Sequence, residues 1–231
     1  MIDTSQCWLK DSCNQVDCGK EYCIKLIKLD YLYNEANISL NQRENVKLSI
    51  SSVNKEDTVA FKYLNNFCGR ILDNIEKGKN LYIYSENVGN GKTVWSIKIL
   101  QSYFNRIWPT SKLECRALFI HVPQFLLALK DNISEKSEYI RHIKDNILNC
   151  DLVIFDELGT KAATQFELEH LLSYINMRLS LGKSCIYTSN IVPDKLSDLL
   201  GDRLASRVVN LSECVELKGP DMRKLTLKKG E

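Results

Sequence analysis

Apolar residues follow a helical period in the stretch between residues 57 and 78. They recur at intervals of three and four residues at Phe61, Leu64, Cys68, Ile71, Leu72 and Ile75. Asp57 stands before the stretch as a candidate cap, and Gly78 stands after it as a candidate stop. The pattern predicts one amphipathic helix here.

After Gly78, short apolar runs alternate with helical stretches. The apolar runs read LYIYS, RALFIHV, DLVIF, CIYTS and CVELKG. Helical sequence begins near Lys92, Pro123 and Pro193, and a further helix is expected around residues 166–179. Because strands that alternate with helices form parallel sheets covered on both faces, we predict an α/β fold with a five-stranded, mainly parallel sheet.

The N-terminal quarter of the chain has a different composition. Four cysteines crowd into the first 23 residues, and a polar passage rich in Asn and Ser follows. We expect a cysteine-rich, metal-binding module over residues 1–30, a linker over 31–56 and the main domain over 57–231. With 44% hydrophobic residues, the chain can build one full core.

Charge and hydropathy narrow the class of protein. A formal charge of +2 is too small for DNA binding that rests on overall charge, so any DNA contact must be local or shared among subunits. The first residues, MIDTSQC, lack the basic and apolar segments of a signal peptide, and no apolar run is long enough to cross a membrane. We expect a soluble, cytoplasmic protein.

The stretch SENVGNGKT, residues 85–93, resembles a phosphate-binding loop, although Glu86 stands where the usual pattern has its first glycine. It lies between a predicted strand and a predicted helix, where backbone N–H groups and the helix dipole favour phosphate. Lys92 would reach the outer phosphates, and the Thr93 hydroxyl would hold magnesium. The candidate nucleotide contacts are Asn87, Val88, Gly89, Asn90, Gly91, Lys92, Thr93 and Val94. The plain alternative is a chance GKT on a surface turn.

Two acids end the apolar run DLVIFDE. Asp156 can hold magnesium through water, and Glu157 can polarise a water for attack on a terminal phosphate. Two solvated acids at the end of a strand are the alternative interpretation. Asn190 ends the next strand, where its amide would approach the attacking water.

Arg203 and Arg207 are four residues apart, so they project from the same face of a predicted helix. Arginine suits a phosphate on a neighbouring subunit because its planar fork stays charged. Two solvated arginines on a surface helix are the alternative.

Taken together, the motifs GNGKT, VIFDE, YTSN, GDRLASR and GPDMRK resemble the AAA+ ATPases. More narrowly, they are similar to helicase loaders of the DnaC/DnaI type, in particular the short ones of phages and mobile elements. This resemblance covers about residues 57–227 and implies an AAA+ P-loop core. It also implies that Asn190 is the first sensor, Arg207 the trans-acting finger with Arg203 as runner-up, and Arg223 the second sensor.

The resemblance implies a function as well. Such a loader binds ATP and magnesium, forms a homo-oligomer, binds a replicative DNA helicase and helps to place it on single-stranded DNA, and hydrolysis serves as a slow switch. Two other functions stay open: a transposition-type, IstB-like ATPase accessory protein that binds DNA, and a small-molecule phosphotransferase.

The clustered cysteines, Cys7, Cys13, Cys18 and Cys23, could supply four thiolates to zinc. An iron–sulfur cluster and free thiols are the alternatives, since no tight C-x-x-C pair is present. The other cysteines, Cys68, Cys115, Cys150, Cys185 and Cys214, stand beside apolar residues, which favours buried positions. We assign no metal to the histidines, His121, His142 and His170.

Overall fold

The computed structural model describes residues 7–9, 13, 23–44, 55–131, 137–160 and 164–221. A single five-stranded sheet lies at its centre, in the order β2-β3-β4-β1-β5. The strands are β1 (Leu81–Tyr84), β2 (Ala117–His121), β3 (Leu152–Asp156), β4 (Ser184–Ser189) and β5 (Glu213–Glu216). Every neighbouring pair is parallel, which confirms the predicted fold class.

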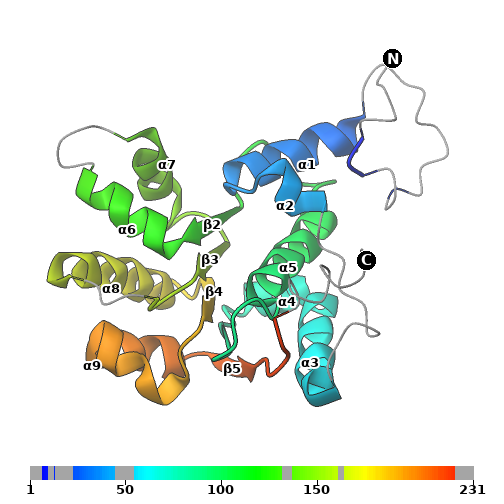
Figure 1. Ribbon diagram of the computed structural model, residues 1–231. Helices are drawn as coiled ribbons and strands as arrows, with labels where there is room; N and C mark the ends of the chain where they lie inside the picture. Colours follow the sequence, from blue (N-terminus) through cyan, green and yellow to red (C-terminus); the bar gives the residue numbers. More distant parts are fainter. Residues whose placement is uncertain are drawn as a thin grey trace, which may run out of the picture.

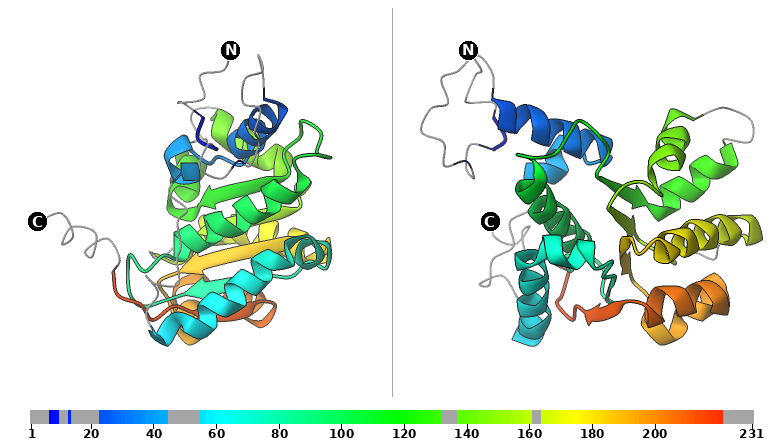
Figure 2. Two further views of the ribbon diagram at one scale, coloured as in Figure 1. Left: turned by 90° about the vertical axis from the view of Figure 1, so that its right-hand side faces the viewer. Right: turned by 180° about the vertical axis from the view of Figure 1, so that it is seen from behind.

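Helices cover both faces of this sheet (Figure 1). One layer holds α6 (Val122–Asp131), α7 (Glu138–Asn146), α8 (Gln165–Ser180) and α9 (Leu196–Asn210), which a 3-10 turn (Pro193–Lys195) precedes. The other layer holds α1 (Ile24–Glu35), α2 (Leu40–Glu44), α3 (Thr58–Gly69), α4 (Ile71–Glu76) and α5 (Lys92–Ile107), after a 3-10 turn at Lys55–Asp57. The view from behind in Figure 2 shows the same two layers with the sheet between them.

Alternation along the strands assigns their side chains to the two layers. In β1, Ile83 packs into the core beneath α1, α3 and α5, whereas Tyr82 packs into the core beneath α6, α8 and α9. In β3, Ile154 and Phe155 divide in the same way. Since successive side chains of a strand point to opposite faces, a strand buried on both faces is mostly apolar, and the buried polar residues gather at the strand ends.

The stretch between residues 57 and 78 forms two helices, so the prediction of one continuous helix is wrong. The break lies at Arg70, whose backbone angles, φ −109° and ψ 28°, are not helical. Asp57 takes the cap position of α3, but its side chain makes no cap hydrogen bond. Its carboxylate accepts instead from the backbone N–H groups of Lys218 and Gly219, at 2.6 and 2.8 Å.

Helix α1 packs on the same core as α3 and α5. Leu29, Leu32 and Tyr33 are fully buried, and the Trp8 indole donates to the Asp30 carboxylate at 2.7 Å. Burial of this face stabilises a helix that extends into the start of the passage predicted as a linker. Helix α1 spans residues 30 and 31, where we predicted a boundary between module and linker, and the division into domains stays a prediction.

No helix in the described part of the chain is both long and apolar enough to cross a membrane.

Candidate active site

The loop after β1 has the backbone conformation that a phosphate cradle requires. Gly89 and Gly91 have φ angles of 70° and 99°, a region that side chains with a Cβ atom rarely adopt. Gly91 is followed at once by α5, whose first residue is Lys92. The N-terminus of a 16-residue helix therefore faces the loop, and its N–H groups and dipole favour an anion there.

Side chains of the loop tie it to the segment after β5. The Asn90 amide donates to the Leu217 carbonyl at 3.0 Å, and the Asn87 amide donates to the Lys218 carbonyl at 3.1 Å. Lys92 Nζ donates to the Asn87 carbonyl at 2.9 Å. The loop is thus held in place by hydrogen bonds within it and to residues 217–219.

Side chains alternate between the two faces of the sheet, and this alternation places polar groups of β2, β3 and β4 on the face that α5 covers. His121 ends β2 and pairs in register with Asp156, which ends β3. Asp156 Oδ1 accepts from the Thr188 hydroxyl of β4 at 2.6 Å and from the Thr93 hydroxyl of α5 at 3.0 Å. Thr93 and the acid 63 residues later, each predicted to hold magnesium, are thus joined by a direct hydrogen bond.

Burial shifts the pKa of Asp156. The residue is only 2% exposed, and this burial raises the pKa of its carboxyl above the usual value, against the opposing hydrogen bonds from Thr188 and Thr93. A buried carboxylate costs free energy unless a cation offsets it. Hydroxyl and carboxylate oxygens are ligands that magnesium prefers, so Thr93 and Asp156 fit that ion.

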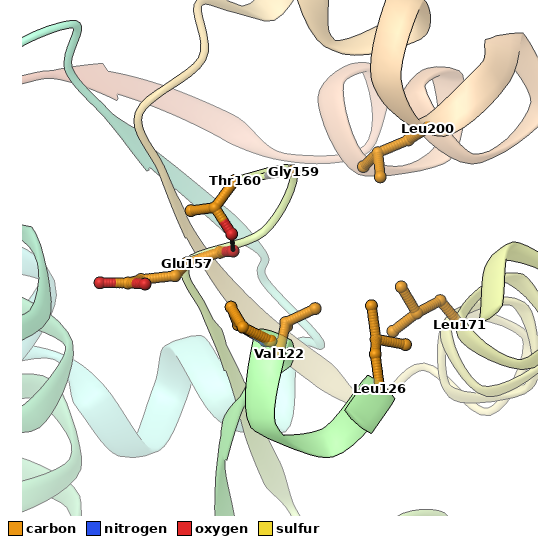
Figure 3. Close-up of a pocket in the computed structure, with 8 residues that line it drawn as sticks. Val122, Leu126, Glu157, Gly159, Thr160, Leu171 and Leu200 are labelled. Atoms are coloured by element: carbon orange, nitrogen blue, oxygen red, sulfur yellow. Dashed lines mark hydrogen bonds between the residues drawn. The ribbon is translucent and has the colours of Figure 1, made fainter. Parts of the chain in front are cut away.

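Glu157 has an unusual backbone. Its φ is 60°, which costs a residue other than glycine about 1–3 kcal/mol. Its N–H donates to the Thr188 hydroxyl at 3.0 Å, and its carbonyl accepts from Thr160. Figure 3 shows the result, in which the carboxylate extends away from the apolar side chains of Val122, Leu126, Leu171 and Leu200. The turn directs Glu157 out of an apolar pocket and into the polar cleft.

A cleft of about 370 Å³ lies over this network. It is lined by Val88, Gly89, Asn90, Gly91, Lys92, Thr93, Val94, Glu157, Thr188, Ser189 and Asn190. The structure thus brings Asn190 and Glu157 to the phosphate loop, as the sequence suggests. Asn87 does not line the cleft, and Glu86 is 69% exposed with its carboxylate 3.6 Å from Lys195 Nζ.

The predicted arginines lie elsewhere. Arg203 and Arg207 are on α9, do not line the cleft, and make a contact with each other, where Arg207 Nη1 donates to the Arg203 carbonyl at 3.4 Å. Helix α9 is kinked at Gly201, which has φ 72° and ψ 156°. Arg223 lies outside the described residues.

Two residues at the site were missed from the sequence. Thr188 stands in the run CIYTS, where its position one residue beyond the buried Tyr187 places it on the α5 face. His121 Nε2 lies 3.3 Å from Glu157 Oε2, and both belong with Asp156 to a group of potential metal ligands. The register of β2 against β3, which no single strand reveals, brings His121 there.

The cysteines divide by burial. Cys68, Cys150 and Cys185 are buried as predicted, whereas Cys214 is exposed and Cys115 is half-buried, so the prediction is wrong for these two. Cys7 and Cys13 pack against the core, and Cys23 caps α1 by accepting from the Leu26 N–H at 3.5 Å.

Cys18 lies outside the described residues. Among the residues that are described, neither group of three close potential ligands contains Cys7, Cys13 or Cys23. The zinc site at the four N-terminal cysteines therefore stays a prediction.

The chain was compared with protein families, with known proteins and with solved structures, and each comparison found similar proteins. The Bacterial DnaA ATPase domain family matches residues 66–211. The replicative helicase loader DnaC of Escherichia coli K12 is 22% identical over 188 residues, which are 80% of this chain and 71% of that protein.

Two solved structures share the fold. The structure of DnaI has a TM-score of 0.61 at 21% identity and covers 76% of this chain and 94% of its own. The replication initiator DnaA bound to AMPPCP and single-stranded DNA has a TM-score of 0.58 at 20% identity and covers 77% and 52%.

Proposed function

Because the chain belongs to the family of the bacterial DnaA ATPase domain, we propose that it is an ATP-dependent loader of a replicative ring helicase. The similarity to the helicase loaders DnaC and DnaI supports this function over the others. Membership of the short loaders of phages and mobile elements stays a prediction.

The observation that carries the nucleotide part of the proposal is the hydrogen bond between Thr93 and Asp156. It joins the end of the phosphate loop to the end of β3 at 3.0 Å, beneath a cleft that two left-handed glycines shape. In the proposed complex, Lys92 and the loop N–H groups bind the phosphates of ATP. Thr93 and Asp156 would hold magnesium, which would offset the phosphate charge.

Glu157 then orients and deprotonates the attacking water. Its carboxylate lines the cleft together with Asn190, which is suited to contact the terminal phosphate and the water. ATP can favour one conformation only through contacts that differ between the two nucleotide states, and Asn190 is placed to make such a contact. Turnover is slow in this proposal because hydrolysis serves to switch the conformation.

Arg223 is proposed as a second sensor. Gly219 lies beside the phosphate loop, because the Asn87 amide approaches its carbonyl at 3.3 Å. The approach of this described segment to the loop is the observation that supports the proposal.

The proposed assembly is an ATP-dependent homo-oligomer in which Arg207 of one subunit completes the site of the next. Its position on α9, away from the cleft of its own chain, supports action on a neighbour. The module over residues 1–30 would bind the helicase, and the oligomer would help to place it on single-stranded DNA.

Retention of the helicase tests the proposal. The full chain is immobilised, and the replicative helicase encoded by the same genome is passed over it with ATP, with ADP and without nucleotide. We expect retention of the helicase to depend on the nucleotide and Lys92→Ala to lose that dependence. Addition of the chain should also raise the loading of the helicase onto closed circular single-stranded DNA.

Other outcomes would favour the competing functions. Failure to retain the helicase in any nucleotide state, with tight binding to duplex DNA, would favour the transposition-type accessory protein. ATP consumption that requires an added small-molecule acceptor would favour the phosphotransferase.

A further inference from the structure

Three potential metal ligands outside the nucleotide site converge from distant parts of the chain. Glu35 is the last residue of α1, Cys115 precedes β2 by two positions, and His142 lies within α7. Their carboxylate, thiol and imidazole ligand atoms all lie within 4.8 Å of one another. All three are half-buried, so an ion there would be partly shielded and still reachable from solvent.

A backbone contact determines the tautomer of His142. Its Nε2 lies 2.8 Å from the carbonyl oxygen of Glu35. A carbonyl can only accept, so Nε2 carries the proton and the neutral ring has its lone pair on Nδ1. Proteins fix metal-binding histidines in this manner, with one ring nitrogen held by a carbonyl and the other left for the ion.

The lone pair of Nδ1 faces another acceptor. Nδ1 lies 3.9 Å from the Glu35 carboxylate, and the Asn146 amide approaches it only at 3.4 Å while donating to the His142 carbonyl at 2.9 Å. Two acceptors in this arrangement repel unless a proton or a metal ion lies between them. The distance leaves room for an ion after small rotations of the side chains.

The Cys115 thiol completes the group. The thiol lies within hydrogen-bond distance of the Ala117 carbonyl, at 3.3 Å, and of the Glu35 carbonyl, at 3.7 Å, and it can donate its one proton to either. Burial, aided by the nearby Cys150 and Glu35, raises the pKa of this thiol well above its usual value. Without a cation the sulfur keeps its proton, and a bound metal ion would displace that proton to solvent.

We propose that Glu35, Cys115 and His142 bind one zinc ion, with water as a fourth ligand. One thiolate, one imidazole and one carboxylate form a donor set that zinc accepts in tetrahedral geometry. The ion would join the end of α1 to α7 and to the chain entering β2. It would thereby attach the helix that follows the N-terminal cysteines to the ATPase core.

Metal content of the full chain tests the site. Protein loaded with zinc and desalted is measured by elemental analysis for wild type, Cys115→Ser and His142→Ala, with Cys214→Ser and His170→Ala as matched controls. The N-terminal cysteines are present in every sample, so they contribute equally. We expect each of the first two variants to lose about one zinc per chain and the controls to lose none. Equal zinc in all five proteins would overturn the proposal.

A measurement on wild type alone covers the case in which a variant does not fold. Alkylation of the native protein, with the modified cysteines mapped by mass spectrometry, is compared with and without zinc. We expect zinc to slow the alkylation of Cys115 at least about tenfold, because an ion bound to Sγ occupies the sulfur electron pair that would otherwise attack the reagent. Alkylation of Cys115 at the same rate in both conditions would reject the site.

Discussion

In the proposed reaction, some residues of the cleft bind ATP and others act on the attacking water. Lys92 and Thr93 begin the helix that faces the proposed phosphate site, and Glu157 lines the same cleft from a left-handed turn. The strain at Glu157 has a consequence, since a carboxylate in ordinary strand geometry would alternate onto the apolar face. The turn instead brings it into the cleft beside Asn190.

Lys92→Ala and Glu157→Gln should therefore fail in different ways. Loss of the ammonium should weaken ATP binding by about 10- to 100-fold or more, the usual cost of a charged hydrogen bond. Glu157→Gln should bind ATP normally and lower the turnover rate by about 10²–10⁴-fold, because the general base is lost. Calorimetry and a phosphate-release assay measure the two effects.

Glu86→Gln is the matched control for these variants. It changes a carboxylate in the same loop that is 69% exposed and paired with Lys195, so we expect binding and turnover to stay within about twofold of wild type. Undiminished hydrolysis by both Lys92→Ala and Glu157→Gln would show that the site has been assigned to the wrong residues.

At the scale of elements, buried polar groups hold the helices in place on the sheet. Arg178 of α8 is fully buried, and its guanidinium donates to the carbonyl oxygens of Cys150, Asp151 and Ser184. These carbonyls stand at the starts of β3 and β4. The side chain thus fixes α8 to the N-terminal ends of β3 and β4, whereas the cleft lies at their C-terminal ends.

The kink of α9 depends on a glycine. Gly201 has φ 72° and ψ 156°, a combination that residues with a Cβ atom avoid, although open space surrounds the position. Gly201→Ala should lower the free energy of unfolding by about 1–3 kcal/mol through backbone strain. It should also lower ATPase activity if Arg207 beyond the kink contacts a neighbouring subunit. Chemical denaturation and an ATPase assay test both effects.

Gly69→Ala provides the comparison for Gly201→Ala. Gly69 ends α3 with no atom within 4 Å of an added Cβ and without a positive φ, so alanine should raise stability by about 0.5–1 kcal/mol. Equal effects of the two substitutions would mean that the left-handed backbone at Gly201 carries no strain.

At the scale of the whole molecule, one chain supplies most of the site and the proposed oligomer supplies the rest. Arg207→Ala should lower turnover by about 10³-fold, the lower bound known for arginine fingers, with little change in ATP affinity. Addition of Glu157→Gln subunits should restore activity, since each carries an intact arginine and no activity of its own. Arg203→Ala serves as the control on the same helix.

A failure to restore activity at every mixing ratio would contradict action between subunits. If Arg207→Ala keeps wild-type turnover, whereas Arg203→Ala loses turnover and regains it on addition of Glu157→Gln subunits, the finger is Arg203 instead.

Much of the molecule follows from local sequence alone. Four largely buried runs separated by helical stretches, with a fifth and mostly exposed strand at the edge, indicate a parallel α/β sheet, because helices on both faces cover the buried strands. The loop and its lysine are likewise local, since a strand, two glycines and a helix N-terminus follow one another within a dozen residues.

Only the tertiary structure decided which distant residues meet. Strand order and register set Thr188 against Asp156 and His121 beside Glu157, and neither property is written in any one segment. Helix α1 docks on α5 through its buried apolar residues, and the same docking brings Glu35 to Cys115 and His142. Local sequence determines where helices and strands form. The contacts between them depend on how their apolar faces pack, and that packing involves residues from the entire chain.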